Sequence, residues 1–155
     1  MSNAPLVAFV RARLDEREAV ARAARPTTAD PTAGHWVAAH PRASPQDEPD
    51  PDLTVVGAQE PDGREWIVAE AGRGQRSPAI AVFIADHDPD AVLRRVVADR
   101  VVLDAYADLA HLDVDGNSYD YPSGQAVGLG FAVRHLAALD AGHPDYQAAW
   151  LPRFT

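Results

Sequence analysis

One segment constrains the fold of this 155-residue chain more than any other, because three helix-start signals coincide at its beginning and apolar residues cover most of its circumference. In Asp88-Pro89-Asp90 the first aspartate can cap a helix, the proline suits the first helical position, and the second acid favours the positive end of the dipole. We expect a helix from Asp88 to about Leu112 that runs through the centre of the core. The polar residues left for its exposed stripe are Arg95, Asp99, Arg100, Asp104 and Asp108.

Further helices are predicted wherever apolar residues recur at helical spacing. They run from about Ala4 to Ala24, from Pro78 to Asp86, from Gln125 to Ala141 and, as a last short helix, from His143 to Trp150. Ser2 or Asn3 can cap the first of them, and Gly142 suits the end of the third. We expect the third to turn five residues inward, namely Leu129, Phe131, Val133, Leu136 and Leu139.

Two β-branched runs, Leu53–Val56 and Trp66–Ala69, flank a Glu60-Pro61-Asp62-Gly63 turn and predict an antiparallel hairpin. A weaker third strand is expected over His35–His40. The proline-rich acidic stretch 41–52 is too polar and too broken by proline to order itself by burial, so we expect a mobile loop there. The predicted fold is one α+β domain spanning residues 1–155, with a small antiparallel sheet, a hairpin or a three-stranded meander, on a layer of about four helices.

Composition excludes several classes of function. The chain has 23 acidic and 14 basic residues, for a formal charge of -9, so we expect no direct binding to nucleic acid or to an anionic membrane. It contains no cysteine, which removes disulfide scaffolds, thiolate zinc sites and cysteine nucleophiles. No window resembles a signal peptide or a membrane helix, and we therefore expect a cytoplasmic protein.

His87-Asp88 resembles the paired ligands of metal-dependent hydrolases, which collect histidines and aspartates from several helices. The capping role of Asp88 explains the same position without any metal. Should a site exist here, His143 and Asp145 are the further candidates from the C-terminal segment. No catalytic residue, metal or other cofactor is predicted, because no set of residues converges in the sequence.

Asp113, Asp115 and Asn117 match the first three ligand positions of a calcium-binding EF-hand loop. The match then fails, because Ser118 stands where the sharp turn needs glycine and Gly124 stands where a bidentate glutamate should close the shell. A polar turn between two helices explains the same residues and is the preferred interpretation, and the sequence leaves cation binding open.

Four aromatic residues, Trp36, Trp66, Tyr146 and Trp150, can serve either as core or as interface anchors. Tyr146 and Trp150 are four apart and are expected to hold the C-terminal tail against the core. Trp36 and Trp66 become candidates for an interaction surface if they lie on one open face of the sheet.

Three motifs taken together resemble a known family. They are the N-terminal amphipathic helix Leu6–Glu16, the His87-Asp88-Pro89 helix start followed by Val92-Leu93-Arg94, and the terminal His143-Pro144-Asp145-Tyr146-x-x-x-Trp150. The resemblance is to small uncharacterised proteins of actinobacteria and their phages, classed as a domain of unknown function. It implies a compact cytoplasmic domain that contains both helices and strands, and it brings no catalytic residue with it.

These observations favour a non-enzymatic protein-interaction or accessory module, with a mobile-element origin left open and an unidentified protein as partner. The first alternative is a metal-dependent hydrolase that uses His87 and Asp88. The second is an acidic mimic of nucleic acid that binds a basic partner through the cluster Asp47–Asp52. Oligomeric state is left open.

Overall fold

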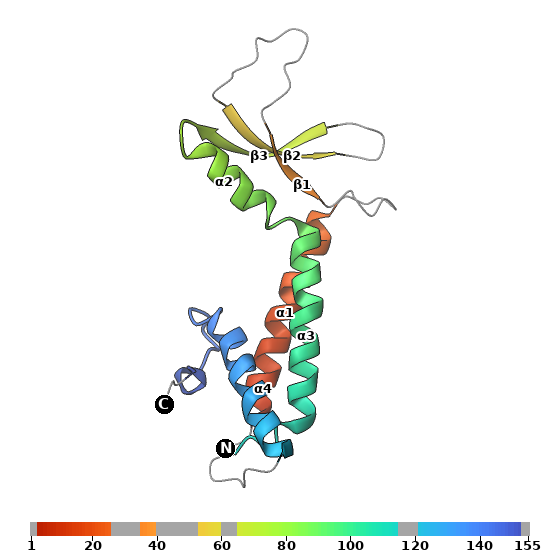
Figure 1. Cartoon of the computed structure of the whole chain (residues 1–155), viewed down its shortest axis with the longest axis vertical. Helices are drawn as coiled ribbons and strands as arrows, with labels where there is room; N and C mark the ends of the chain where they lie inside the picture. Colours follow the sequence, from red (N-terminus) through yellow and green to blue (C-terminus); the bar gives the residue numbers. More distant parts are fainter. Residues whose placement is uncertain (1–2, 26–34, 40–52, 60–64, 115–120, 153–155) are drawn as a thin grey trace. The chain divides into compact units, whose positions relative to one another are not determined.

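A computed structural model describes residues 3–25, 35–39, 53–59, 65–114 and 121–152 (Figure 1). Its elements in chain order are α1 (Ala4–Ala24), β1 (Trp36–Ala39), β2 (Leu53–Gln59), β3 (Glu65–Arg73), α2 (Ser77–Ala85), α3 (Pro89–Leu109), α4 (Tyr121–Ala138) and the 3-10 helix η1 (Ala148–Trp150). The α+β prediction is therefore confirmed. Within the described ranges, none of the helices has the length and apolar character needed to cross a bilayer.

The chain divides into two compact units, and the division falls within α1 and α3. The first unit comprises residues 1–18 and 95–155, and the second comprises residues 19–94. The single domain expected from the sequence over residues 1–155 stays a prediction. The predicted acidic loop at 41–52 and the predicted turn at 60–63 lie outside the described residues.

The second unit is built round a three-stranded antiparallel sheet in the order β1-β2-β3, which confirms the hairpin and the third strand (Figure 1). Helix α2 lies against one face of this sheet, where Ala81 and Ala85 pack with Val56 of β2. Ser77, Ala81 and Ala85 are buried and spaced four apart, so the fully buried side chains of α2 are all small. Partly buried residues complete the cluster: Trp36, Ala38, Val68, Ala69, Ala71 and Ile84.

The first unit is helical, and ion pairs show that α1 and α3 run antiparallel within it. Arg100 bonds Asp15 at 2.6 Å and also contacts Glu18, while Arg11 bonds Asp104 at 3.0 Å. The hydrogen bond to Asp15, followed by the one to Glu18, raises the pKa of Arg100. Asp15 and Glu18 of α1 thus pair with Arg100 of α3. The largest fully buried side chains of this unit are Tyr106, Leu6, Leu14 and Leu103.

Helix α3 begins after Asp88 as predicted, but the expectation that it runs through the centre of the core was wrong. Val96 and Leu103, seven residues apart, are buried, whereas Val97 is 63% and Val101 67% exposed. Neighbouring helices cover only one side of α3, and valine is tolerated on a surface because folded proteins lack enough polar area to cover themselves.

Helix α4 begins at Tyr121 and ends at Ala138, several residues earlier at both ends than predicted. Two of its five expected inward residues are exposed, Phe131 at 41% and Leu139 at 65%. Small residues take the inward face, and its buried members are Ser123, Ala126, Gly130, Val133 and Ala137. Small side chains let helices approach closely, so here the size of the side chain decides the packed face more than its hydrophobicity.

The start of the first unit is tied down by contacts that the sequence did not predict. The side-chain amide of Asn3 donates hydrogen bonds to the carbonyls of Ala110 and Asp113, at 3.0 and 2.9 Å. At the other end the predicted last helix is reduced to turns and η1.

Candidate functional site

Asp88 is 2% exposed and acts as a junction between elements of the second unit. One carboxylate oxygen accepts a hydrogen bond from the backbone N–H of Ala91 at 2.5 Å, which confirms the predicted cap. The other oxygen lies 2.8 Å from Nδ1 of His35 and accepts the N–H of Trp36 at 3.4 Å. Both oxygens are thus engaged in joining the start of α3 to the start of β1. Sequence reasoning missed His35 as a partner, since the contact spans more than fifty residues.

The side chain of His87 points away from that of Asp88. Its ring is exposed, with Nδ1 2.7 Å from the carbonyl oxygen of Phe83 and the two ring centroids 4.5 Å apart. His87 therefore closes the last turn of α2 while Asp88 points into the protein. Among the residues described, no three histidine, aspartate or glutamate side chains form a group that could hold a metal ion.

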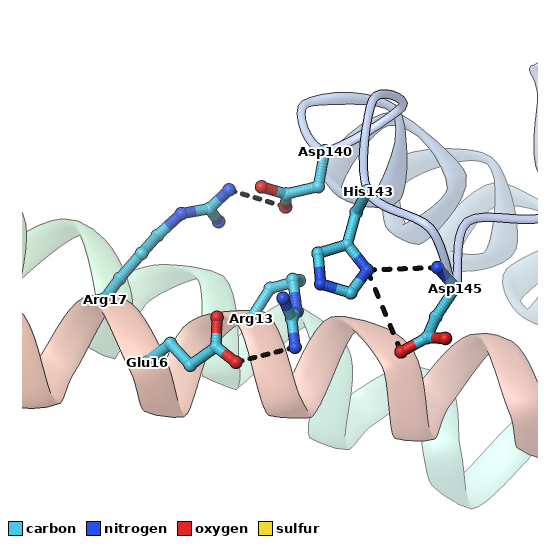
Figure 2. A network of polar contacts seen from close by, with 6 residues as sticks. All are labelled: Arg13, Glu16, Arg17, Asp140, His143 and Asp145. Atoms are coloured by element: carbon cyan, nitrogen blue, oxygen red, sulfur yellow. Dashed lines mark hydrogen bonds and ion pairs between the residues drawn. The ribbon is translucent and has the colours of Figure 1, made fainter.

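His143 and Asp145 lie in the first unit, where they form a local turn (Figure 2). The backbone N–H of Asp145 donates to Nδ1 of His143 at 3.1 Å, and its carboxylate lies 3.8 Å from the same nitrogen. Accepting that bond leaves the proton of the neutral ring on Nε2. On α1, Arg13 bonds Glu16 at 2.7 Å, and Arg17 reaches Asp140 at 2.6 Å (Figure 2). The pair of Arg17 and Asp140 joins the segment before this turn to α1.

An aromatic cluster also joins the C-terminal segment to α1. The ring of Phe9, 7% exposed, is 6.0 Å from that of Tyr146 and 5.1 Å from that of Trp150. Tyr146 and Trp150 are 5.8 Å apart, so the predicted contact between them is present although the helix is not. The guanidinium of Arg13 lies over the Phe9 ring at 5.6 Å. The terminal motif His143–Trp150 therefore packs against α1. The described contacts of His143 and Asp145 lie within the first unit, and those of His87 and Asp88 lie within the second.

Asp113, the first residue of the calcium-like motif, belongs to a buried network of the first unit. Its Oδ2 accepts the hydroxyl of Tyr106 at 2.7 Å and the guanidinium of Arg134 at 2.8 Å. Burial first, and then the hydrogen bond to Asp113, raises the pKa of Tyr106. A guanidinium on this carboxylate disfavours a cation beside it. Asp115 and Asn117 lie outside the described residues.

The two tryptophans occupy one row of the sheet, since Trp36 pairs with Ala58 and Ala58 pairs with Trp66. Trp36 packs against the cluster beneath α2, so α2 covers this face at Trp36. The Trp66 side chain lies outside the described residues. Their role in an interaction stays a prediction.

A groove of about 600 Å³ lies in the first unit between the start of α1 and the end of α3. Its lining is mostly small and apolar, with Arg11 and His111 as the charged or titratable side chains. Because Arg11 is paired with Asp104, this groove offers no acid–base pair for a reaction.

The outward face of α2 is the least expected feature of the second unit. Ile80 is 45%, Val82 50% and Phe83 65% exposed, and no residue between Ser77 and Ala85 is charged. The residues that the helix buries are thus small, and three of its four large apolar residues are exposed. The four-residue spacing of Ser77, Ala81 and Ala85 was the sequence signal that would have shown this.

Comparison with known proteins gives a family and nothing more specific. Neither a curated protein nor a solved structure matches the chain significantly. Residues 3–152, which include every helix and strand described above, match the profile of the Family of unknown function (DUF6221), and the chain therefore belongs to that family.

Proposed function

We propose that this protein is a non-enzymatic protein-interaction module whose binding surface is the outward face of α2. The observation that carries the proposal is the exposure of Ile80, Val82 and Phe83 within four residues of one helix. Single exposed apolar residues are ordinary, but a contiguous apolar patch on a soluble protein usually marks a contact site. An apolar helix face that presents neighbouring large side chains is also a recurrent element of protein recognition.

The described geometry of the alternative site residues favours structural roles. Asp88 has both oxygens engaged, the His87 ring bonds the Phe83 carbonyl of α2, and His143 accepts the N–H of Asp145. A metal-dependent hydrolase would need at least one of these side chains to turn toward a common ion. The acidic-mimic alternative depends on residues 47–52, which lie outside the described residues. A cytoplasmic location and an actinobacterial or phage source stay predictions from the sequence.

The proposal is tested with a photoreactive phenylalanine analogue at position 83 of the full chain, expressed in the native host. A matched probe at Val101 has nearly the same exposure, 67% against 65%, but lies on α3. We expect a light-dependent protein adduct at position 83 that is absent at position 101. The adduct should also disappear when Ile80→Asp is added to the same chain, because a charge in the patch opposes apolar contact.

Two results would overturn the proposal. One is the same background of adducts at positions 83 and 101, or an adduct at 83 that Ile80→Asp does not affect. The other is turnover of a phosphoester or peptide library by the pure protein that is lost on changing His87 or Asp88. The adduct is identified by mass spectrometry, so the experiment also reports whether the partner is another copy of the chain or a different protein.

A further inference from the structure

Helix α2 carries charges of unexpected sign at its two ends. Arg76 occupies the N-cap position without a side-chain capping bond, and Asp86 occupies the C-cap position. Both residues are exposed. A helix N-terminus is electropositive and prefers an acid, whereas its C-terminus prefers a base, so both side chains disfavour α2 as an isolated helix. Such an arrangement suggests that the charges serve a contact outside the helix.

From this pattern we infer that the partner of α2 is a second copy of the chain, bound so that two α2 helices lie antiparallel about a two-fold axis. The inference rests on the proposed function and names its partner. In this arrangement Arg76 meets Asp86 of the second copy, and each also lies beside the helix end that it prefers. A rise of about 1.5 Å per residue separates the two charges by about 15 Å, so both ion pairs form at once.

The apolar residues between these charges are complementary in the same register. An axis at the level of Ala81, in the middle of α2, brings Phe83 opposite the small Ala79 of the second copy. Ile80 and Val82 are about 160° apart around the helix and flank this contact on its two sides. The large ring therefore meets a small side chain, as side-chain ridges require when helices pack. A two-fold axis uses the same patch on both copies, which is the commonest form of self-association.

The expected dimer is weak. Two nine-residue helices bury much less than the roughly 1,200–2,000 Å² of a standard stable interface. The formal charge of -9 per copy adds a long-range repulsion. We expect a Kd on the order of 10–100 µM at physiological salt, where the Debye length of about 8 Å screens distant charges but leaves direct contacts.

Charge exchange tests the register. Sedimentation equilibrium of the full chain over a range of concentrations should show a monomer–dimer equilibrium. Arg76→Asp places acid against acid at both ends, and Asp86→Arg places base against base, so each variant alone should bind itself roughly tenfold more weakly. An equal mixture of the two variants should form a heterodimer with the affinity of the unsubstituted chain, because every contact is then complementary. The double variant R76D/D86R should regain self-association for the same reason.

The same variants provide a control for correct folding. Each substitution gives a helix end the charge that its dipole prefers, so thermal unfolding by circular dichroism should show no loss of stability. Val101→Asp, at an equally exposed position of α3, should leave the equilibrium unchanged. The inference is overturned if the single variants associate like the unsubstituted chain, or if mixing them restores nothing.

The outcomes separate this inference from the proposed function. A chain that stays monomeric at all concentrations, with a light-dependent adduct between position 83 and a different protein, overturns the second copy as partner and keeps the interaction module. A monomeric chain without any specific adduct at position 83 overturns both. Adducts between two copies of the chain, lost in Arg76→Asp, support both.

Discussion

The two units of this protein differ in which side chains they bury. In the first, the buried apolar residues include leucine, phenylalanine and tyrosine, with Leu14, Leu103 and Tyr106 inaccessible to solvent. In the second, the described buried apolar residues are valine and alanine alone: Ala21, Val55, Val56, Ala58, Ala81 and Ala85. Both units expose some large apolar side chains, but in the second the largest apolar side chain described as fully buried is that of Val56.

This difference indicates where stability and function are placed. Hydrophobic stabilisation grows with the apolar area removed from water, so large buried side chains contribute most per residue. The first unit buries side chains of this size in its core, while the second exposes Ile80 and Phe83 on α2. A helix that packs by alanine and presents its large residues outward gains little from folding alone and more from a partner.

The largest expected effect tests this contrast directly. Leu103→Ala should lower the free energy of unfolding of the first unit by about 2–5 kcal/mol, because it removes a buried side chain and leaves a cavity. Phe83→Ala should change that of the second unit by less than about 0.5 kcal/mol, because its side chain is already largely in water. Amide hydrogen exchange reads the two units separately. Similar losses for the two variants would contradict the contrast.

A second prediction concerns the polar junction that joins the elements of the second unit. Asp88→Ala should cost about 2–3 kcal/mol, since it removes the cap of α3 and leaves the N–H of Trp36 without its acceptor. Asp88→Asn keeps an oxygen for Ala91 and should cost clearly less. Urea unfolding of the pair checks this. An equal loss for both variants would mean that the negative charge, and not the cap, matters at this junction.

Two glycines of α4 should respond to alanine with opposite signs. A Cβ at Gly130 would collide with the carboxylate of Asp113 and lie 2.8 Å from the guanidinium of Arg134, so Gly130→Ala should destabilise the first unit by about 1–2 kcal/mol. A Cβ at Gly128 meets nothing within 4 Å, and Gly128→Ala should stabilise the unit by about 0.5–1 kcal/mol through helix propensity. Thermal unfolding measures both. A gain at both positions would show that the Asp113 network adjusts without cost.

The smallest effect is a pH dependence confined to the first unit. Burial and Asp113 raise the pKa of Tyr106, so the folded state keeps its proton more tightly than the unfolded state does. That stabilisation is complete below the ordinary tyrosine pKa of about 10 and is lost as pH rises through the raised value, by at most about 1.4 kcal/mol per pH unit. Tyr106→Phe should lack this dependence. Comparing the two unfolding free energies between pH 8 and 11 checks it, and parallel curves would contradict it.

Local signals predicted much of the secondary structure. Helix α1 has its predicted bounds, because Pro26 follows its end in the sequence and apolar residues recur on one face. These residues are Leu6, Val10, Leu14 and Ala21. Asp88 caps α3 as predicted, since a cap depends on atoms three residues away. The bounds of α4 were wrong by several residues, because its first turns contain residues such as Pro122 and Gly124 that intrinsic propensity assigns to a loop.

Faces and partners were harder to predict than elements. Hydrophobicity assigned Phe131 and Leu139 to the core, but close helix packing selected the smaller Ala126 and Gly130. The candidate site residues show the same limit. Sequence reasoning gave His143 and Asp145 a chemical role, whereas Asp145 bonds His143 within one turn and the His143 ring lies 5.7 Å from that of Phe9 on α1.

The amino-acid sequence alone determined which segments form most of the helices and strands, that together they make an α+β fold, and that Asp88 starts α3, because each of these depends on neighbours along the chain. Only the tertiary structure decided that His35 reaches Asp88 and that Tyr106 and Arg134 both bond Asp113. These outcomes depend on which surfaces can approach most closely. Residues far apart in the sequence settle that together, through side-chain volume and hydrogen-bond satisfaction.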